Sequence, residues 1–549
     1  MALRTWFLIG LILLTVGLTV GVEILYQYSD QGKFLPNGGL FSYQNVNELT
    51  TIQFAIWKYL PTLVGVLFGI IWKVTDEGLK RGEPYYQLSK GGKGALASES
   101  LNIEYHTIWS PFVPITAIRH KQFVVAAGGF LSTLASAVVP VLLSVFIRVD
   151  PNQDTRQELH EVNKMKYEDM VKRIVIDVKF TRVLEATLVI IIGLGCYILV
   201  KVYRRKSGLL GDPSGIAGVA AMANKSHILM DFKGLDLATE ATIHQQLNKR
   251  TYMLHKGALW QAQLLKENAR DQAIPKAMNP HPLLLRVKGM GPFILFCLAI
   301  LIIIPIIPSN DNLNNLVDNA PWLITGLSVL LKSIWELVEK DMRMLEPFWI
   351  LFNRQAHSSV LTLDYTATIP GFVVLKAIFK GHYLLAWVTF VTLLVEVLTV
   401  VMGSLGFQLG EGFEFGEESK TSAEISKWLA IGILVILILS DLLVLWYRRY
   451  SFLPRQPGTI SSVLAFIHQS RMLMDFEGTE EKTTFERKQI LKKLGKHYGF
   501  GWYLGRDGKR HLGIDQEPLL ERYVFGVDPR QGVLDTPPVG WDTYEHNAV

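Results

Sequence analysis

WFLIGLILLTVGLTVGVEILY (Trp6–Tyr26) decides the class of this protein, because it is apolar over its whole length apart from Glu23 and two threonines. A helix of about 20 apolar residues crosses a hydrocarbon core roughly 30 Å thick. Comparable runs lie near 56–74, 123–147, 183–203, 292–307, 321–338, 382–406 and 428–447. The sequence therefore predicts an all-α integral membrane protein with about eight transmembrane helices. The run at 292–307 is short and interrupted by prolines.

The composition agrees with a membrane protein. Of the 549 residues, 49% are hydrophobic and only 19% are charged, whereas soluble domains carry about 25% charged residues. The first run has no small-residue cleavage motif after it, which favours a retained anchor over a signal peptide. Both cysteines, Cys196 and Cys297, fall inside apolar runs. We therefore expect no disulfide framework.

Lysine and arginine are unevenly distributed among the loops. Most of them lie in segments 75–121, 204–291, 339–381 and 448–549, which the positive-inside rule places in the cytosol. We therefore expect both termini to be cytosolic, in either the plasma membrane or an endomembrane. The net charge of +6 is then explained by topology and attraction to anionic lipids, and does not call for a nucleic-acid partner.

The chain contains an internal duplication. WKVTDEGLKRGEPYYQL (72–88) aligns with WELVEKDMRMLEPFWIL (335–351), and SHILMDFKG (226–234) aligns with SRMLMDFEG (470–478). Between them, LNIEYHTIWSPFVPITAI aligns with LTLDYTATIPGFVVLKAI. Three matches in one order predict two units, 1–291 and 292–549. Because four spans per unit is an even number, the two repeats should be parallel.

These repeated motifs resemble a fungal family of polytopic membrane proteins with a tandem domain of unknown function. The resemblance implies a fold and a fungal membrane setting. It implies no activity, so no catalytic residue follows from it.

The repeated motifs are interpreted as structural. Pro84 and Pro347 discourage helical geometry in the residue before them, so we predict an elbow where each second helix leaves the membrane. The helices that precede L-M-D-F could lie on the inner leaflet or pack inside a cytosolic domain. The residues assigned to this structural set are Trp72, Glu83, Pro84, Tyr85, Tyr86, Trp335, Glu346, Pro347, Phe348, Trp349, Asp231, Phe232, Asp475 and Phe476.

Two acids inside apolar runs are the candidate functional residues. Glu396 and Asp441 have no basic residue that we expect at the same depth, and intramembrane acids often serve ion pathways. A proton or cation role and a buried packing role both remain open for them. In the tail, Asp507-Gly508 predicts a hairpin. A basic group at its tip could contact lipid or a partner: Arg506, Lys509, Arg510 and His511.

No catalytic motif or metal-ligand spacing is present in the sequence, and we expect no cofactor. The favoured function is a non-enzymatic membrane scaffold that presents duplicated cytosolic modules to proteins or to anionic lipid head groups. A transporter or channel that uses Glu396 and Asp441 is the alternative, and a lipid-modifying enzyme is third. The sequence leaves the oligomeric state open.

Overall fold

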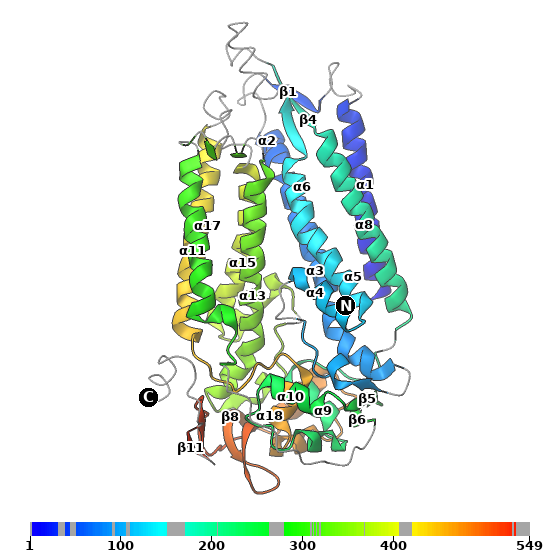
Figure 1. Ribbon diagram of the computed structural model, residues 1–549, viewed down its shortest axis with the longest axis vertical. Helices are drawn as coiled ribbons and strands as arrows, with labels where there is room; N and C mark the ends of the chain where they lie inside the picture. The colour runs from blue at the N-terminus through cyan, green and yellow to red at the C-terminus, as the bar shows by residue number, and fades with distance from the viewer. Residues whose placement is uncertain are drawn as a thin grey trace.

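The computed structural model describes residues 3–30, 39–43, 51–90, 94–105, 110–150, 171–205, 207–262, 279–307, 310, 312–313, 316–317, 320–366, 368–405, 420–529 and 532–533. Its long helices stand side by side in a bundle, and short helices and small sheets gather at the lower end (Figure 1). We call this lower part the extramembrane domain, and it consists of residues 94–105, 207–262, 356–366 and 450–529.

Six helical segments of the described chain are long and apolar enough to cross a membrane. They are α1 (Thr5–Asp30), Phe123–Val145, α8 (Val178–Tyr203), α11 (Val287–Ile306), α15 (Tyr383–Leu405) and residues Glu424–Arg448 of α17 (Lys420–Arg448). The second segment comprises α5 (Phe123–Thr133), a π-helical turn (Leu134–Val138) and α6 (Val139–Val145). The chain is thus a mostly helical protein with the helices of a multi-pass membrane protein, as predicted.

The predicted spans near 56–74 and 321–338 fall in two longer helices outside this group of six. These are α3 (Leu60–Ser89), which follows α2 (Thr51–Lys58), and α13 (Trp322–Phe352). Both lie inside the bundle, where α3 contacts α5, α6 and α15 while α13 contacts α15 and α6. The expected count of eight apolar spans is not reached because charged side chains on α3 and α13 lower their hydropathy.

The two halves of the bundle repeat the same neighbours. In the first half α1 packs on α8 and α3 packs on α5 and α6, and in the second half α11 packs on α17 and α13 packs on α15. The halves stand next to each other in Figure 1, blue to cyan beside green to yellow. Contacts of α13 and α15 with α6, and of α15 with α3, join them.

Small antiparallel sheets make the all-α prediction incomplete. The extramembrane domain has three-stranded sheets in the orders β2-β5-β6 and β7-β8-β9, and β10 pairs with β11. The sheet β1-β4-β3 lies at the opposite end of the bundle. Sequence did not predict most of these strands because they are short and pair with distant segments. The hairpin predicted at Asp507-Gly508 is confirmed. The strands are β1 (Phe41–Tyr43), β2 (Ala95–Leu96), β3 (Ile147–Asp150), β4 (Lys172–Ile176), β5 (Thr251–His255), β6 (Ala258–Gln261), β7 (Ala356–His357), β8 (His497–Leu504), β9 (Arg510–Gln516), β10 (Val527–Asp528) and β11 (Gly532–Val533).

The remaining helices are short. They are α4 (Val113–Arg119), α9 (Gly215–Ala223), α10 (Glu240–Leu247), α14 (Pro370–Phe379), α18 (Ile460–Ile467) and α19 (Thr484–Lys493). Single 3-10 turns are η3 (Ala97–Glu99), η4 (Ser110–Phe112), η7 (His227–Phe232), η8 (Leu283–Leu285), η10 (Ser358–Val360) and η11 (Arg471–Phe476).

The helices that precede the two L-M-D-F motifs are buried on all sides. Every residue of α9 from Ile216 to Ala223 and every residue of α18 from Ser461 to Ile467 is buried, and the two helices contact each other. The interpretation that they lie on the membrane surface is therefore wrong, and packing inside a folded domain is confirmed. One hydrophobic core joins residues of both helices, so the two halves share one extramembrane domain.

The predicted elbow at the E-P motifs is also wrong. Helix α3 continues through Pro84 to Ser89, and α13 continues through Pro347 to Phe352. A proline inside a helix removes one backbone hydrogen bond and clashes with the preceding turn. Here side-chain contacts around each proline support the continued helix.

Each E-P motif holds an arginine. The Glu83 carboxylate lies 2.5 Å from the guanidinium of Arg205, which also sits 3.9 Å from the centre of the Tyr86 ring. In the second half, Glu346 lies 2.6 Å from Arg448, and Arg448 sits 4.0 Å from the centre of a Trp349 ring. Arg205 lies two residues after the end of α8, and Arg448 is the last residue of α17. Because a ring face is what attracts the cation, tyrosine and tryptophan are interchangeable here.

The other repeated residues make contacts within the extramembrane domain or lie in the hydrophobic core. Tyr252 donates to Asp231 over 2.7 Å and Tyr498 donates to Asp475 over 2.9 Å, so each motif aspartate holds the first strand of a hairpin. Six motif side chains are buried in the core: Trp72, Trp335, Tyr85, Phe348, Phe232 and Phe476.

We predict that Glu346→Ala destabilises the protein by about 3–5 kcal/mol, because it leaves the buried Arg448 guanidinium without its carboxylate partner. Unfolding of the purified chain in mixed micelles, followed by fluorescence, measures this change. Glu477→Ala is the control, since Glu477 is exposed, and it should stay within about 0.5 kcal/mol of wild type. Equal stability of the two variants would contradict the role of the E-P motif.

Candidate functional site

Glu396 on α15 has a basic partner in the bundle. Its carboxylate lies 2.7 Å from the ammonium group of Lys332 on α13, and both side chains are largely buried. The expectation that no basic residue lies at this depth is therefore wrong. Lys332 belongs to the apolar run 321–338 itself, but only the packing of α13 against α15 reveals the pairing.

Asp441 on α17 lies in a different environment. The residue is fully buried, and neither carboxyl oxygen accepts a hydrogen bond from the described residues. No ion pair or hydrogen bond between Asp441 and Glu396 occurs in the described part of the chain. The structure therefore does not combine the two acids into one site.

Charged residues also connect α3 with α13. Lys73 lies 2.5 Å from Glu336, and Lys340 lies 3.8 Å from Glu77. In the alignment of 72–88 with 335–351, each pair occupies equivalent positions with opposite charges. The contacts therefore run between like positions of the two repeats, and the pairing compensates the cost of removing these ions from water.

A second charged pattern repeats within each helix. Asp76 pairs with Lys80 over 2.5 Å, four residues along α3, and the equivalent Glu339 and Arg343 pair in α13. All four residues are buried. These ion pairs explain how two helices with many charges can occupy the inside of the bundle.

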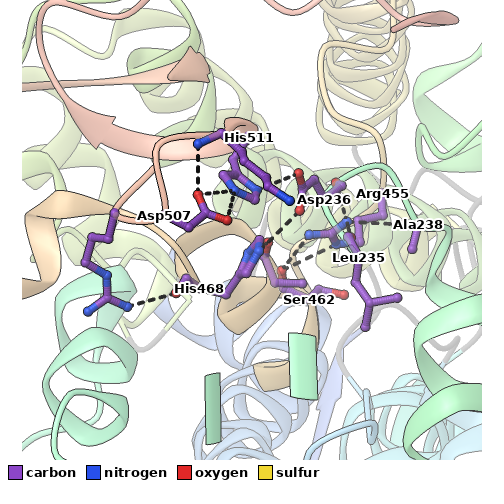
Figure 2. A network of polar contacts seen from close by, with 11 residues as sticks. Leu235, Asp236, Ala238, Arg455, Ser462, His468, Asp507 and His511 are labelled. Atoms are coloured by element: carbon purple, nitrogen blue, oxygen red, sulfur yellow. Dashed lines mark hydrogen bonds and ion pairs between the residues drawn. The ribbon is translucent and has the colours of Figure 1, made fainter. Parts of the chain in front are cut away.

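A buried polar cluster joins the two halves inside the extramembrane domain (Figure 2). It combines Asp236 from the loop after η7, His468 at the end of α18 and His511 on β9. His511 Nδ1 lies 3.0 Å from Asp236 Oδ2, and His468 Nε2 lies 3.3 Å from Asp236 Oδ1. The other nitrogen of His511 lies 3.0 Å from Asp507.

Arg455 fixes the loop that carries Asp236. Its guanidinium donates to the backbone carbonyls of Leu235, Asp236 and Ala238 at 2.8–3.1 Å, and to the carbonyl of Ser462 at 3.4 Å (Figure 2). The same group sits 4.0 Å from the centre of the Phe466 ring. Loop 235–238 of the first half is thereby held on α18 of the second half.

The pKa values of the basic groups in this cluster are shifted in different directions. It lowers the pKa of His468 to about 4 and that of Arg455 to about 9. Burial also opposes the charged form of His511, but hydrogen bonds with Asp236 and Asp507 outweigh it and raise the pKa of His511 above its ordinary value. The three residues Asp236, His468 and His511 could together hold a metal ion.

The sequence did not reveal this cluster. His511 was expected at an exposed hairpin tip, but it is buried, and Arg506 donates to the backbone carbonyl of His468 over 3.0 Å. The other two members of the predicted basic group, Lys509 and Arg510, are exposed, and their side chains are not part of the cluster. Asp236 and His511 are 275 residues apart, so no local spacing could have indicated that they meet.

Two short helices carry exposed apolar faces next to the bundle. On α4 and the residue before it, Phe112, Ile115 and Ile118 are each about half exposed. On α14 the exposed apolar side chains are Phe372, Leu375, Ile378 and Phe379. Each helix directly precedes an apolar helix, α5 or α15, and spacing at every third or fourth residue is typical of an amphipathic face.

A polar cleft of about 600 Å³ opens between η3, α4 and α10. Both polar atoms of the Asn102 side chain are buried there without a hydrogen bond from the described residues. Carboxylates, imidazoles and amides suit a ligand with hydroxyl or amine groups. The polar lining includes Ser98, Asn102, Glu104, Tyr105, Thr116, His120, Glu240, His244, Gln245, Asn248 and Gln456.

We predict that Glu396→Leu destabilises the protein by about 3–5 kcal/mol, since it leaves Lys332 buried without its counter-ion. The double variant Lys332→Met/Glu396→Leu should recover most of this loss, because no buried ion then remains unpaired. Unfolding in mixed micelles measures both, with the exposed Glu424→Gln as control. A double variant as unstable as the single one would contradict the pairing.

In the comparison with known proteins, one family profile matches parts of the sequence. The sequence profile described as a protein of unknown function (DUF3433) matches residues 55–148 and matches again at residues 320–407. The first match runs from α2 through α6 and the second from α13 through α15, with the E-P motif in both. No curated protein and no solved structure matches the chain. The fungal origin stays a prediction, whereas the predicted tandem domain of unknown function is confirmed, because the DUF3433 profile is found twice in the chain.

Proposed function

We propose that this protein is a non-enzymatic membrane scaffold, in which eight transmembrane helices in two parallel repeats hold one cytosolic domain against the inner leaflet. The observation that carries the proposal is the shared core of the extramembrane domain, where α9 of the first half packs on α18 of the second. A domain built jointly by both repeats has a fixed position under the bundle. Such a rigid platform suits presentation of surfaces better than movement of two halves against each other.

Several contacts support eight spans. Helices α3 and α13 are 30 and 31 residues long, which exceeds the roughly 20 residues needed to cross a membrane. Their charges are paired within the bundle, as Lys73 is with Glu336. The equivalent arginine contacts of Glu83 and Glu346 support a parallel arrangement, because both glutamates lie near the C-terminal end of their helix, α3 or α13.

The surface of the extramembrane domain also repeats. Met230 and Met474 are the only residues of the two L-M-D-F motifs with a strongly exposed side chain, at 65% and 66%. Methionine makes adaptable apolar contacts and is favoured at variable binding surfaces. Two equivalent exposed methionines therefore support the presentation of duplicated surfaces to cytosolic proteins.

Contact with the inner leaflet is supported by α4 and α14. Their exposed apolar faces are bordered by the basic residues Arg119, Lys121, Lys376 and Lys380. This combination is typical of helices that lie in the interface of an anionic membrane. The polar cleft beside α4 would then lie at the depth of lipid head groups.

We predict that the segment between α15 and α17 faces away from the cytosol while both termini face it. An Asn-x-Thr sequon inserted into that segment should be glycosylated in eukaryotic cells, as judged by a glycosidase-sensitive shift on a gel. The natural sequon Asn224-Lys225-Ser226 is the internal control and should stay unmodified. Modification at Asn224 alone would indicate the opposite orientation.

We predict that Phe379 lies in lipid. Phe379→Cys, labelled with an environment-sensitive dye in a Cys196→Ala background, should be strongly quenched by lipids brominated near the head group. Phe485→Cys on α19 is the matched control, since Phe485 is 69% exposed against 87% for Phe379, and it should not be quenched. Equal quenching at the two positions would argue against the inner-leaflet contact.

Transport remains the second candidate, and the observation in its favour is that buried Asp441 accepts no hydrogen bond from the described part of the chain. The pairing of Glu396 with Lys332 weighs against it, because the Glu396 charge is already neutralised within the bundle. Proteoliposomes with a pH gradient separate the two functions. Proton flux above that of empty vesicles, abolished by Asp441→Asn, would replace the scaffold proposal with a transporter.

A further inference from the structure

The cluster of Asp236, His468 and His511 has the dimensions of a metal site. One ligand atom from each residue lies within 4.8 Å of the others, and all three residues are buried. In a tetrahedral site with bonds of about 2.0–2.1 Å, neighbouring ligand atoms are roughly 3.3 Å apart. His468 Nε2 lies 3.3 Å from Asp236 Oδ1, and His511 Nδ1 lies 3.0 Å from Asp236 Oδ2. Each nitrogen is therefore near this spacing from one oxygen of the carboxylate.

The outer contacts of the two histidines fit the same role. His511 Nε2 faces the Asp507 carboxylate at 3.0 Å, and His468 Nδ1 faces the backbone carbonyl of Ala465 at 3.2 Å. A histidine that binds a metal usually donates its second N–H to a carboxylate or a carbonyl. His511 Nδ1 and His468 Nε2 both face Asp236 (Figure 2), and with those protons on the outer nitrogens their lone pairs would be available to a metal ion.

A purely hydrogen-bonded network explains the cluster less well. His468 is fully buried, and the 3.3 Å contact of its Nε2 with Asp236 does not have the geometry of a hydrogen bond, nor does Nε2 form one with another described residue. An unsatisfied buried nitrogen costs free energy, and a metal ion between the three residues would remove that cost. Burial also excludes the interpretation that these are surface side chains gathered by chance.

We propose that Asp236, His468 and His511 bind one divalent transition-metal ion, with Zn²⁺ as the best match. Two imidazoles and one carboxylate favour Zn²⁺ over Mg²⁺ and Ca²⁺, which prefer oxygen ligands. Asp236 and Asp507 supply two negative charges against the ion. Arg455 directs its N–H groups to backbone carbonyls and acts as a positioning residue for the loop that carries Asp236.

The ion would connect the two repeats. Asp236 belongs to the first half, and both histidines belong to the second. All three residues are buried, and the ion would stabilise the joined domain by linking its two parts. This inference does not depend on the scaffold function, since a transporter could use the same structural ion.

Metal analysis of the full-length chain tests the inference. The protein carries a tag without histidine, is purified in detergent, stripped with a chelator and equilibrated with micromolar Zn²⁺. Mass spectrometry after desalting should find about one ion per chain. His468→Gln and Asp236→Asn should abolish this binding, while the exposed His255→Gln should retain it.

A second measurement covers variants that fail to fold. Co²⁺ added to the stripped wild-type protein should give the visible absorption bands of a tetrahedral site, and Zn²⁺ should displace it. The melting temperature of the wild type should fall by several degrees on stripping and recover with Zn²⁺. A stripped wild-type chain that takes up no ion, or Zn²⁺ binding equal in wild type and His468→Gln, would overturn the proposal.

Discussion

The pairing of largely buried charges between α3 and α13 is the constraint on which the rest of the structure depends. An ion removed from water is stable only with a partner of opposite charge and suitable geometry. Lys73 pairs with Glu336, and Glu77 pairs with Lys340. Because one partner of each pair comes from each repeat, neither helix can be buried without the other. The position of the two halves follows from this requirement.

The E-P motifs connect these charged contacts of the bundle with the extramembrane domain. They lie on the same two helices, a few turns beyond the charged contacts, and each binds an arginine at the end of the last long helix of its half. The chain enters the domain directly after those arginines. Asp231 and Asp475 then hold the hairpins through Tyr252 and Tyr498. A series of polar contacts, equivalent in both halves, thus connects the bundle centre to the shared domain.

Sequence predicted the features that depend on local pattern. Apolar length indicated the membrane helices, self-alignment indicated the tandem domain, and Asp507-Gly508 indicated the β8–β9 hairpin. The elbow at Pro84 was wrong, because a local preference was outweighed by the contacts of Glu83 and Tyr86 with Arg205.

Contacts between distant segments could not be predicted. The partner of Glu396 became visible only once α13 and α15 were packed together. The cluster around Asp236 brings together residues up to 275 positions apart, and no motif spacing connects them. Of the predicted functional acids, Glu396 belongs to an ion pair and Asp441 stands apart from it, so sequence indicated residues of interest without indicating their partners.

Divergence between the repeats has a physical reason at their shared face. If both copies carried lysine at the position of Lys73, two like charges would meet inside the bundle, and two copies with glutamate would repel in the same way. Opposite charges at equivalent positions make the mixed pair favourable and the pairing of identical copies unfavourable, which is specificity through repulsion.

The extramembrane domain shows a related asymmetry between the two halves. Asp236 reaches the histidines of the other half, whereas the equivalent acid, Glu480, pairs with Lys225 at 3.2 Å. Each half thus supplies an acid to the other, and only one of the two contacts has acquired the donors of a metal site.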